Sequence, residues 1–346
     1  MGWKENNNPA AVIDSIACFD AAHPPGYYVL AYYLSSFLGL SSLSLRGLAA
    51  FLGLFQIPLA FLLAKELFKE NRIAWLAAAF IALSPVQVSY SQEAKEYSAI
   101  SSLFLLSTYL FLKALEKNDI ASWLKHLFSV AVGFYTSGLL VIVSFIQLAY
   151  TFLAKEYRER KAHLWVLSVN GIALLLFAPW LKIITDNSST ALGVMDWLKT
   201  KMPLADWFMN FICGSVSAFF DPGHSIHLMH EDNIAYSAIV LFVLLVQFVS
   251  LLALLNLEKK KRVFVYLTIV LYLVPFVLPD LLFGGIRSIF VRYFLPLSTL
   301  MCLVVAYGIS EGFLSENKPK KFLSYASVLI IICCQLYSDF VFAQSQ

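Results

Sequence analysis

The chain has 346 residues, of which 60% are apolar and only 14% are charged, whereas about a quarter of the residues are charged in an average soluble domain. Apolar stretches recur along nearly the whole chain and leave no room for a soluble domain of ordinary size, so the sequence predicts an all-α polytopic membrane protein. The net charge of +3 indicates no particular partner, because in such proteins the placement of Lys and Arg holds the information.

Residues 1–43 precede the first predicted span. The stretch from His23 to Leu40, "HPPGYYVLAYYLSSFLGL", is apolar and aromatic but interrupted by serines, a composition typical of a helix lying in the outer membrane interface. The topology places residues 1–43 outside, yet no signal sequence or spanning helix precedes them. We therefore expect residues 1–43 to be the remnant of a first outer loop, in a chain truncated or wrongly started at its N-terminus. Residues 44–346 then form the multi-pass transmembrane domain.

A spanning helix needs about 20 apolar residues, and the sequence predicts about ten of them. The fourth and fifth are short and meet at Tyr135 to Gly138, so a single kinked helix is the alternative there. One long outer loop, about 184–233, follows the sixth span. The predicted spans are 44–64, 73–90, 97–115, 122–136, 138–154, 164–183, 234–256, 263–283, 293–312 and 322–342.

Basic residues set the predicted orientation. Alternate loops hold 17 of the 25 Lys and Arg residues, and such loops face the cytoplasm in a plasma (inner) membrane protein. The stretch "SYSQEAKEY", residues 89–97, therefore faces the periplasm or cell exterior. Most prolines lie near the outer ends of apolar segments, and broken backbone at membrane depth is tolerated where it lines a cavity. We expect the site in the outer half.

The five cysteines show no metal-binding spacing, and a disulfide between Cys18 and Cys213 is the only pairing the topology suggests. In the outer loop, His224, His227 and His230 lie at i, i+3 and i+6. On a helix two of them could share a metal ion. A polar loop explains these histidines equally, so we expect no metal and no other cofactor.

Charged residues gather at the outer side without an evident structural need, which makes them functional candidates. Arg offers a planar fork to phosphate oxygens and Lys a compact charge, so the mixture suits a lipid-borne phosphate. Snorkelling of the basic side chains to lipid headgroups is the alternative. The cations are Arg46, Lys95, Arg287 and Arg292, and the acids are Asp20, Glu93, Glu96 and Asp280.

Four motifs occur in order over residues 20 to about 310: "DAAHPPGYYVL", "LRGLAAFLGL", "LSPVQVSYSQEAKEYSAISSLFLL" and "RSIFVRYFLPLSTLMCLVVAYGI". Together they resemble the polyprenyl- or dolichyl-phosphate-sugar glycosyltransferases of the C-type membrane fold (GT-C), and most closely the bacterial branch of the protein O-mannosyltransferase group. The resemblance implies a membrane transferase with a polyprenyl-phosphate sugar donor, an acceptor at the outer face and no nucleic-acid partner.

Residue by residue, the resemblance covers four elements and departs from the family pattern at three places. The first loop has one residue more between Asp20 and His23, and Lys95 stands where the family usually has Arg. The family's catalytic Asp, which follows a first spanning helix, has no counterpart here, so the resemblance implies that this chain lacks the family's base. The matching residues are Asp20, His23, Pro24, Pro25, Arg46, Ser91, Gln92, Glu93, Lys95, Tyr97, Arg292 and Tyr293.

The chemistry that the resemblance implies explains these residue types. A sugar on a lipid phosphate has a good leaving group, so the enzyme needs cations to hold the departing phosphate and a carboxylate to deprotonate the acceptor hydroxyl, with inversion. Asp20 is the better candidate for this base and Glu93 the second, with orientation of the cations as an alternative role for Glu93. The expected substrate-binding residues are His23, Arg46, Gln92, Lys95, Tyr97, Arg287, Arg292 and Tyr293.

Two other functions compete with this interpretation. A transporter or flippase of a lipid-linked glycan would show repeats and charged or broken helices at the midplane, whereas the charges and prolines here gather at one side. An inactive fragment of the transferase is the other alternative, because of the missing first helix.

Overall fold

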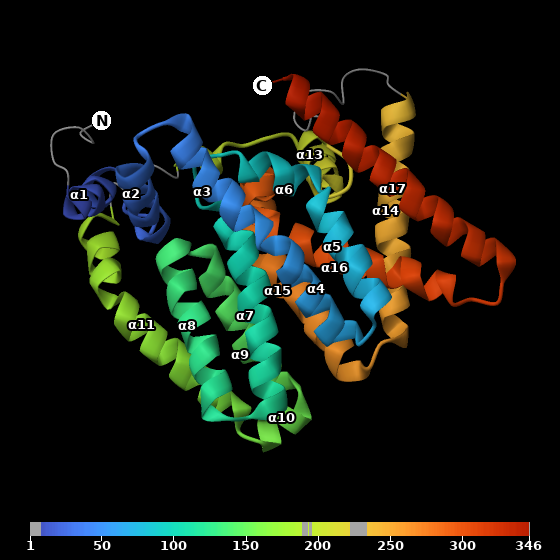
Figure 1. Ribbon diagram of the computed structural model, residues 1–346, viewed down its shortest axis with the longest axis horizontal. Coiled ribbons are helices and arrows are strands. Elements are labelled where there is room, and N and C mark those ends of the chain that lie inside the picture. Colours follow the sequence, from blue (N-terminus) through green and yellow to red (C-terminus); the bar gives the residue numbers. More distant parts are fainter. Residues whose placement is uncertain (1–7, 189–192, 194–195, 222–233, 346) are drawn as a thin grey trace.

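The computed structural model describes residues 8–188, 193, 196–221 and 234–345, and all regular elements in these residues are helices (Figure 1). The predicted fold class, an all-α polytopic membrane protein, is confirmed. The elements are α1 (Pro9–Phe19), α2 (Gly26–Leu38), α3 (Ser42–Leu54), α4 (Gln56–Phe68), α5 (Asn71–Ala82), α6 (Pro85–Ser91), α7 (Tyr97–Lys117), α8 (Ile120–Thr136), α9 (Leu139–Leu153), α10 (Lys155–Glu159), α11 (Ala162–Asp186), η2 (Asp196–Lys199), α13 (Leu204–Val216), α14 (Ile234–Ala253), η4 (Leu254–Asn256), α15 (Lys259–Phe283), η5 (Arg287–Ile289), η6 (Val291–Phe294), α16 (Leu295–Phe313) and α17 (Lys318–Gln344).

Seven helical segments of the described chain are long and apolar enough to cross a membrane, and the bent pair of α5 and α6 raises this number to eight. Each of the ten predicted spans falls on helix, but α8 and α9 have only 17 and 15 residues, so the count of ten stays a prediction. The seven segments are Ser42–Phe68, Tyr97–Lys117, Ala162–Asp186, Ile234–Asn256, Lys259–Phe283, Val291–Phe313 and Lys318–Gln344.

Between residues 120 and 153 the structure has two helices and not the single kinked helix that was the alternative. Helix α8 ends at Thr136, and α9 begins at Leu139 and runs back beside it (Figure 1). Helix α8 packs mainly on α7 and α11, whereas α9 packs mainly on α15 and also contacts α7, α8 and α11.

The predicted span 73–90 is broken. Helices α5 and α6 meet at an angle of 53°, and Pro85 occupies the first turn of α6 after an extended Ser84. Proline disfavours the helical conformation of the residue before it, which explains why the helix stops and restarts here. The bend turns α6 away from the direction of α5 at the end of the bundle where α3 begins and α17 ends (Figure 1).

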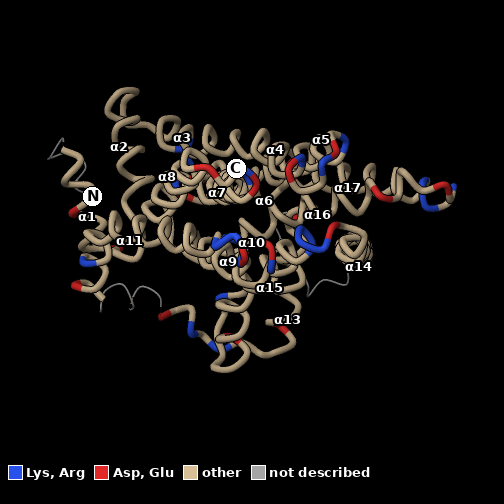
Figure 2. The backbone as a smooth tube through the Cα atoms, turned by 90° about the horizontal axis from the view of Figure 1, so that it is seen from below, with Lys and Arg blue, Asp and Glu red and all other residues tan. Residues whose placement is uncertain are grey.

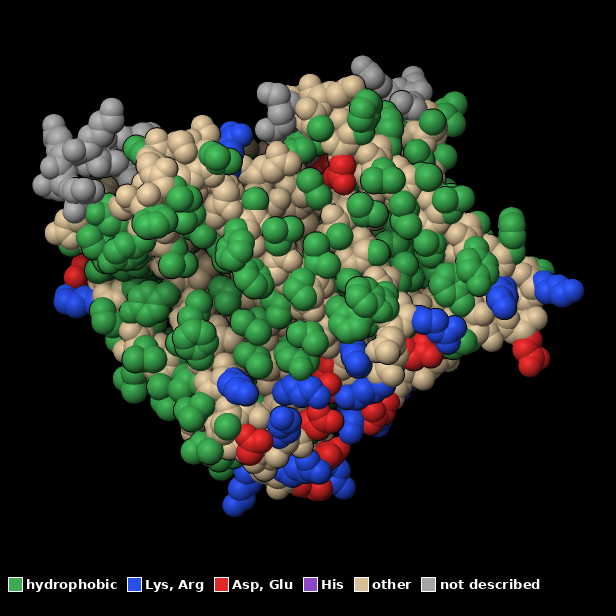
Figure 3. Space-filling view, in the orientation of Figure 1, with side chains coloured by type: hydrophobic (Ala, Val, Ile, Leu, Met, Phe, Trp, Pro, Cys, Tyr) green, Lys and Arg blue, Asp and Glu red, His purple; other side chains and the backbone are tan. Residues whose placement is uncertain are grey.

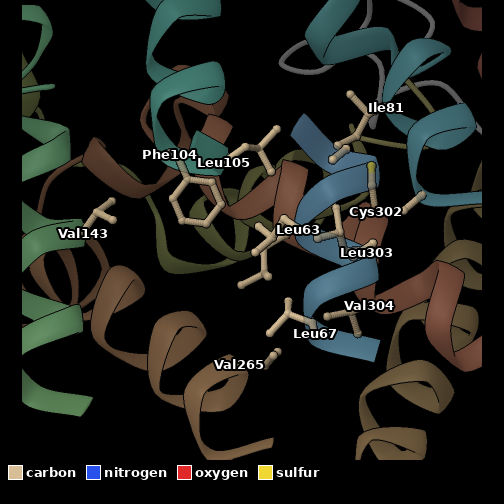
Figure 4. Close-up of a cluster of buried hydrophobic side chains, with 14 of the residues drawn as sticks. Leu63, Leu67, Ile81, Phe104, Leu105, Val143, Val265, Cys302, Leu303 and Val304 are labelled. Atoms are coloured by element: carbon tan, nitrogen blue, oxygen red, sulfur yellow. The ribbon is translucent and has the colours of Figure 1, made fainter. Parts of the chain in front are cut away.

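Two spans form the centre of the bundle. About 70% of the most apolar part of each of α7 and the η6–α16 segment is buried (67% and 72%), against 28% for the other five spans. Side chains from both helices meet α4, α5, α9 and α15 in the apolar core shown in Figure 4. Helices α4 and α5 contribute fully buried alanines, Ala60, Ala64, Ala74 and Ala77, and small residues allow close approach of helices within a membrane.

Charged residues gather at the end of the bundle where α4 and α7 finish (Figures 2 and 3). Ion pairs there connect separate helices: Lys113 lies 2.6 Å from Glu66, and Lys260 lies 3.7 Å from Glu156. One end of the bundle is therefore cross-linked by ion pairs. The beginnings of α3 and α7 lie at its other end.

Helices α1 and α2 have 11 and 13 residues, which is too short to cross a bilayer. Helix α2 packs against α3 and α8 and exposes Leu30, Tyr33 and Phe37. Its length agrees with the predicted interfacial helix, whose place in the membrane stays a prediction.

The suggested disulfide is wrong. All five cysteines lie in the described residues and all are unpaired. Cys18 is exposed on α1, whereas Cys213 is buried on α13 and accepts a hydrogen bond from Tyr236 Oη at 3.7 Å.

Candidate active site

A cavity of about 540 Å³ lies at the end of the bundle opposite the ion-paired helices. Helix α6 and the loop after it form its floor. Helix α6 packs against both α3 and α17, which lie on different sides of α6 in Figure 1, and Arg46 of α3 and Phe342 of α17 both line the cavity. The lining residues are Arg46, Pro85, Ser89, Tyr90, Gln92, Glu93, Ala94, Lys95, Asp221, Ile289, Phe290, Val291 and Phe342.

Helix α6 is fixed below the cavity by a buried amide. Gln87 Nε2 donates to Ser298 Oγ at 3.0 Å and to the Leu295 carbonyl at 3.4 Å, and Gln87 Oε1 accepts from Ser101 Oγ at 2.9 Å. Buried polar groups cost free energy unless they are hydrogen-bonded, so these bonds favour one placement of α6 against α7 and α16. The floor of the cavity is thereby held by the two central spans.

Helix α3 brings Arg46 to the cavity. Ser41 caps the helix by accepting a hydrogen bond from the Ser44 amide, and Ser44 returns the interaction in a capping box, which is a strong signal for a helix start. Ser98 Oγ of α7 donates to the Ala49 carbonyl at 2.7 Å. Arg46 therefore lies in the second turn of a helix fastened to the centre of the bundle.

Arg46 and Lys95 both line the cavity. On this side of the described chain the ion pairs join other residues, namely His23 with Asp20 and Glu96, Arg287 with Asp280, Lys182 with Asp186 and Lys199 with Asp196. Lys95 Nζ instead lies 5.7 Å from the ring centroid of Tyr97. Arg46 and Lys95 thus line one cavity, and neither forms an ion pair with a described carboxylate.

Glu93 lines the same cavity as Lys95. Partial burial raises the pKa of its carboxyl above the ordinary value, although the positive charges of Lys95 and Arg292 act in the opposite direction. A carboxylate whose pKa is raised is a better proton acceptor at neutral pH than an ordinary one.

Asp20 and His23 lie outside the cavity lining and join the N-terminal segment to the start of α7. His23 Nδ1 lies 2.8 Å from Asp20 Oδ1, and His23 Nε2 lies 3.6 Å from Glu96 Oε1. Tyr28 Oη donates to Glu96 Oε2 at 3.0 Å. The hydrogen bond to Asp20 raises the pKa of His23, partly offset by burial and reinforced by Glu96. Glu96, which is buried, was named among the outer acids but was given no catalytic or binding role.

Arg287 also lies outside the cavity. Its Nη1 pairs with Asp280 Oδ1 at 2.8 Å, and Asp280 Oδ2 accepts from Ser288 N and Oγ, both at 2.7 Å. Gly285 has φ +148°, and a Cβ there would lie 2.5 Å from Asp280 Oδ1, so the turn requires glycine. This cluster anchors the segment whose residues Ile289 and Phe290 line the cavity.

Arg292 is surrounded by aromatic rings. Its guanidinium carbon lies 5.3 Å from the ring centroid of Trp197, 4.9 Å from that of Phe290 and 5.5 Å from that of Tyr293, a cation–π arrangement. Its positive charge is near enough to Glu93 to offset part of the rise that burial causes in the pKa of that carboxyl. Arg292 therefore lies close to the cavity wall without being part of it.

The structure brings four of the ten predicted site residues into the cavity lining, Arg46, Gln92, Glu93 and Lys95. It also adds a carboxylate that sequence reasoning missed, Asp221, whose backbone amide donates to Ser338 Oγ of α17 at 3.0 Å. No sequence motif marks Asp221. The six predicted residues outside the lining are Asp20, His23, Tyr97, Arg287, Arg292 and Tyr293.

His224, His227 and His230, the alternative metal ligands, lie outside the described residues. Within the part of the chain that is described, no group of three or more His, Cys, Asp or Glu side chains could hold a metal ion.

The fold is similar to that of two solved structures of ArnT. ArnT from Cupriavidus metallidurans bound to undecaprenyl phosphate superimposes with a TM-score of 0.64 at 13% sequence identity, over 94% of this chain and 57% of that one. ArnT from the same organism in the apo state gives a TM-score of 0.57 at 11% identity, over 97% of this chain and 70% of that one. This chain thus spans little more than half the length of the first of these proteins.

Residues 22–183 match the family model described as dolichyl-phosphate-mannose-protein mannosyltransferase. No curated protein sequence matches the chain. The match begins at Ala22, inside the first motif noted in the sequence, and includes the second and third motifs entirely. The resemblance to polyprenyl-phosphate glycosyltransferases is therefore confirmed.

Proposed function

We propose that the protein transfers one sugar from a polyprenyl-phosphate donor to the hydroxyl of an acceptor at the outer face of the membrane, with inversion at the anomeric carbon. The observation that most supports this function is that Arg46 and Lys95, two cations that form no ion pair with a described carboxylate, line the same cavity. The lipid in the structurally similar ArnT, undecaprenyl phosphate, has the headgroup chemistry that these cations would bind.

The cations stabilise the leaving group. As the bond between the anomeric carbon and the phosphate oxygen breaks, negative charge grows on the phosphate, and Arg46 and Lys95 are placed to bind that charge. Lys95 is a point charge rather than a bidentate fork. The departing lipid phosphate then needs no proton from the protein.

We place the base at Glu93 rather than at Asp20. Glu93 lines the cavity with the cations, whereas Asp20 lies outside the lining and pairs with His23 at 2.8 Å. The Glu93 carboxylate would take the acceptor hydroxyl proton while the hydroxyl oxygen attacks the anomeric carbon on the face opposite the phosphate. The new glycosidic bond forms as the bond to phosphate breaks, which gives inversion.

Binding of undecaprenyl phosphate to the purified protein tests this function. We expect Arg46→Ala and Lys95→Ala each to weaken binding about tenfold or more, because a charge-assisted hydrogen bond contributes about 1.5–3 kcal/mol. Lys182→Ala is the matched control, since Lys182 pairs with Asp186 at 2.8 Å away from the cavity. Equal affinity in all four proteins, in titrations monitored by intrinsic fluorescence, would refute the proposed phosphate site.

A further inference from the structure

The cavity has a second carboxylate, Asp221, on a segment that leaves the regular helix of α13. After Val216 the chain turns, and the amides of Phe219 and Phe220 both donate to the Val216 carbonyl, at 2.8 and 3.0 Å. The rings of Phe219 and Phe220 are buried in the core. These contacts hold the turn inside the protein and bring Asp221 to the cavity wall.

Two polar residues of α17 bind the peptide groups of this turn. Gln335 Nε2 donates to the Ala218 carbonyl at 3.0 Å, and Ser338 Oγ accepts from the Asp221 amide at 3.0 Å. Both side chains are fully buried, and residues three apart on a helix lie on one face. Buried polar side chains in a spanning helix cost free energy unless they are hydrogen-bonded. The hydrogen bonds of Gln335 and Ser338 to the turn therefore fix the position of Asp221.

Asp221 and Arg46 lie on different flanks of the cavity. Arg46 belongs to α3 and Asp221 is held by α17, and α6 packs between these two helices. Phe342 of α17 lines the cavity on the flank of Asp221. The cationic flank suits the donor phosphate, whereas an anion beside that phosphate would repel it. The neutral sugar is the part of the donor that can approach Asp221.

A carboxylate is an acceptor with two oxygens and about four lone-pair positions, so it can accept hydrogen bonds from the hydroxyls of a sugar ring. We propose that Asp221 binds hydroxyl groups of the transferred sugar, and that Gln335 and Ser338 are the positioning residues that hold it there. This proposal rests on the function proposed above and adds to it a residue that recognises the sugar itself.

The test compares binding of bare undecaprenyl phosphate with binding of undecaprenyl phosphate that bears a mannose, glucose, galactose or pentose. The native chain is expected to bind at least one sugar-bearing lipid more tightly than the bare lipid. Asp221→Ala should leave the affinity for the bare lipid unchanged. It should reduce the additional affinity that the sugar provides about tenfold, the loss expected for hydrogen bonds to a charged group. Ser338→Ala should also reduce this additional affinity, because it removes the acceptor of the Asp221 amide and so loosens the position of Asp221.

Asp206→Ala is the matched control, since Asp206 is an exposed carboxylate in the first turn of α13. The proposal is overturned if Asp221→Ala weakens both kinds of lipid equally or neither of them, or if the native chain gains nothing from any of the sugars. A native chain that does not bind the bare lipid would refute the proposed function, and this proposal with it.

Discussion

Glu93 and Asp20 differ in what surrounds their carboxyl groups. Glu93 lies on the cavity wall, where burial raises its pKa above 4.5, and Asp20 is bonded to His23 beside the buried Glu96. The first environment suits a proton acceptor and the second suits a structural contact. The sequence favoured Asp20 because of its motif, and only the packing distinguishes the two.

The role of Glu93 predicts a pH dependence. A base must be ionised to act, so the rate of sugar transfer should fall as the pH drops through the raised pKa of Glu93, giving an acidic limb above pH 4.5. Glu93→Gln should lower the rate about 10²–10⁴-fold, as expected for loss of a general base. A pH–rate profile of transfer measures both effects.

Glu70→Gln is the control for this substitution, because Glu70 lies at the other end of the bundle and pairs with Arg72. A Glu93→Gln protein that transfers sugar at the native rate would assign the base to another residue.

Three of the four residues that the sequence identified within the cavity share one property. Gln92, Glu93 and Lys95 are consecutive or nearly so, and a local motif can reveal them. Glu96 and Asp221 depend on distant partners instead: Tyr28 is 68 positions from Glu96, and Ser338 is 117 positions from Asp221. No local pattern contains such contacts, so sequence reasoning could not place these two residues.

Among the elements, the contact between α14 and α16 is unusually close. A Cβ added to Gly308 would lie 2.5 Å from the Ser250 Cα, and backbone cannot yield as the end of a flexible side chain can. Gly308→Ala should therefore destabilise the protein by about 1–3 kcal/mol, the usual cost of overpacking. Thermal unfolding in detergent, followed by circular dichroism, measures the change.

Gly171→Ala on α11 provides the matched comparison, because nothing lies within 4 Å of its added Cβ and alanine favours a helix more than glycine does. If the Gly308→Ala protein unfolds at the same temperature as the native protein, α14 and α16 do not approach each other as closely as the structure indicates.

Apolar length predicted the helices well but not their interruptions. The span 73–90 was expected to be continuous, yet Pro85 breaks it into α5 and α6 with a bend of 53°. A proline near the end of an apolar run can mark either a helix end or a bend. Whether the chain ends its helix or bends at Pro85 depends on the contacts that α6 makes with α3 and α17. Hydropathy gives no information about these contacts.

At the scale of the whole molecule, charge separates the two ends of the bundle. Ion pairs such as Lys113 with Glu66 connect helices at one end, and the cavity lined by Arg46 and Lys95, which form no ion pair within the described chain, lies at the other. The separation follows from the pattern of Lys and Arg in the sequence. The proposed function requires that the cavity end face away from the cytoplasm.

Labelling of Lys95→Cys with a membrane-impermeant maleimide in intact cells tests this requirement most directly, with the exposed Cys18 and Cys333 replaced by serine. Arg72→Cys, at an exposed position of the ion-paired end, serves as the opposite reference. The account predicts that the thiol at 95 reacts in intact cells and the thiol at 72 only after the cells are opened. The reverse pattern would contradict it.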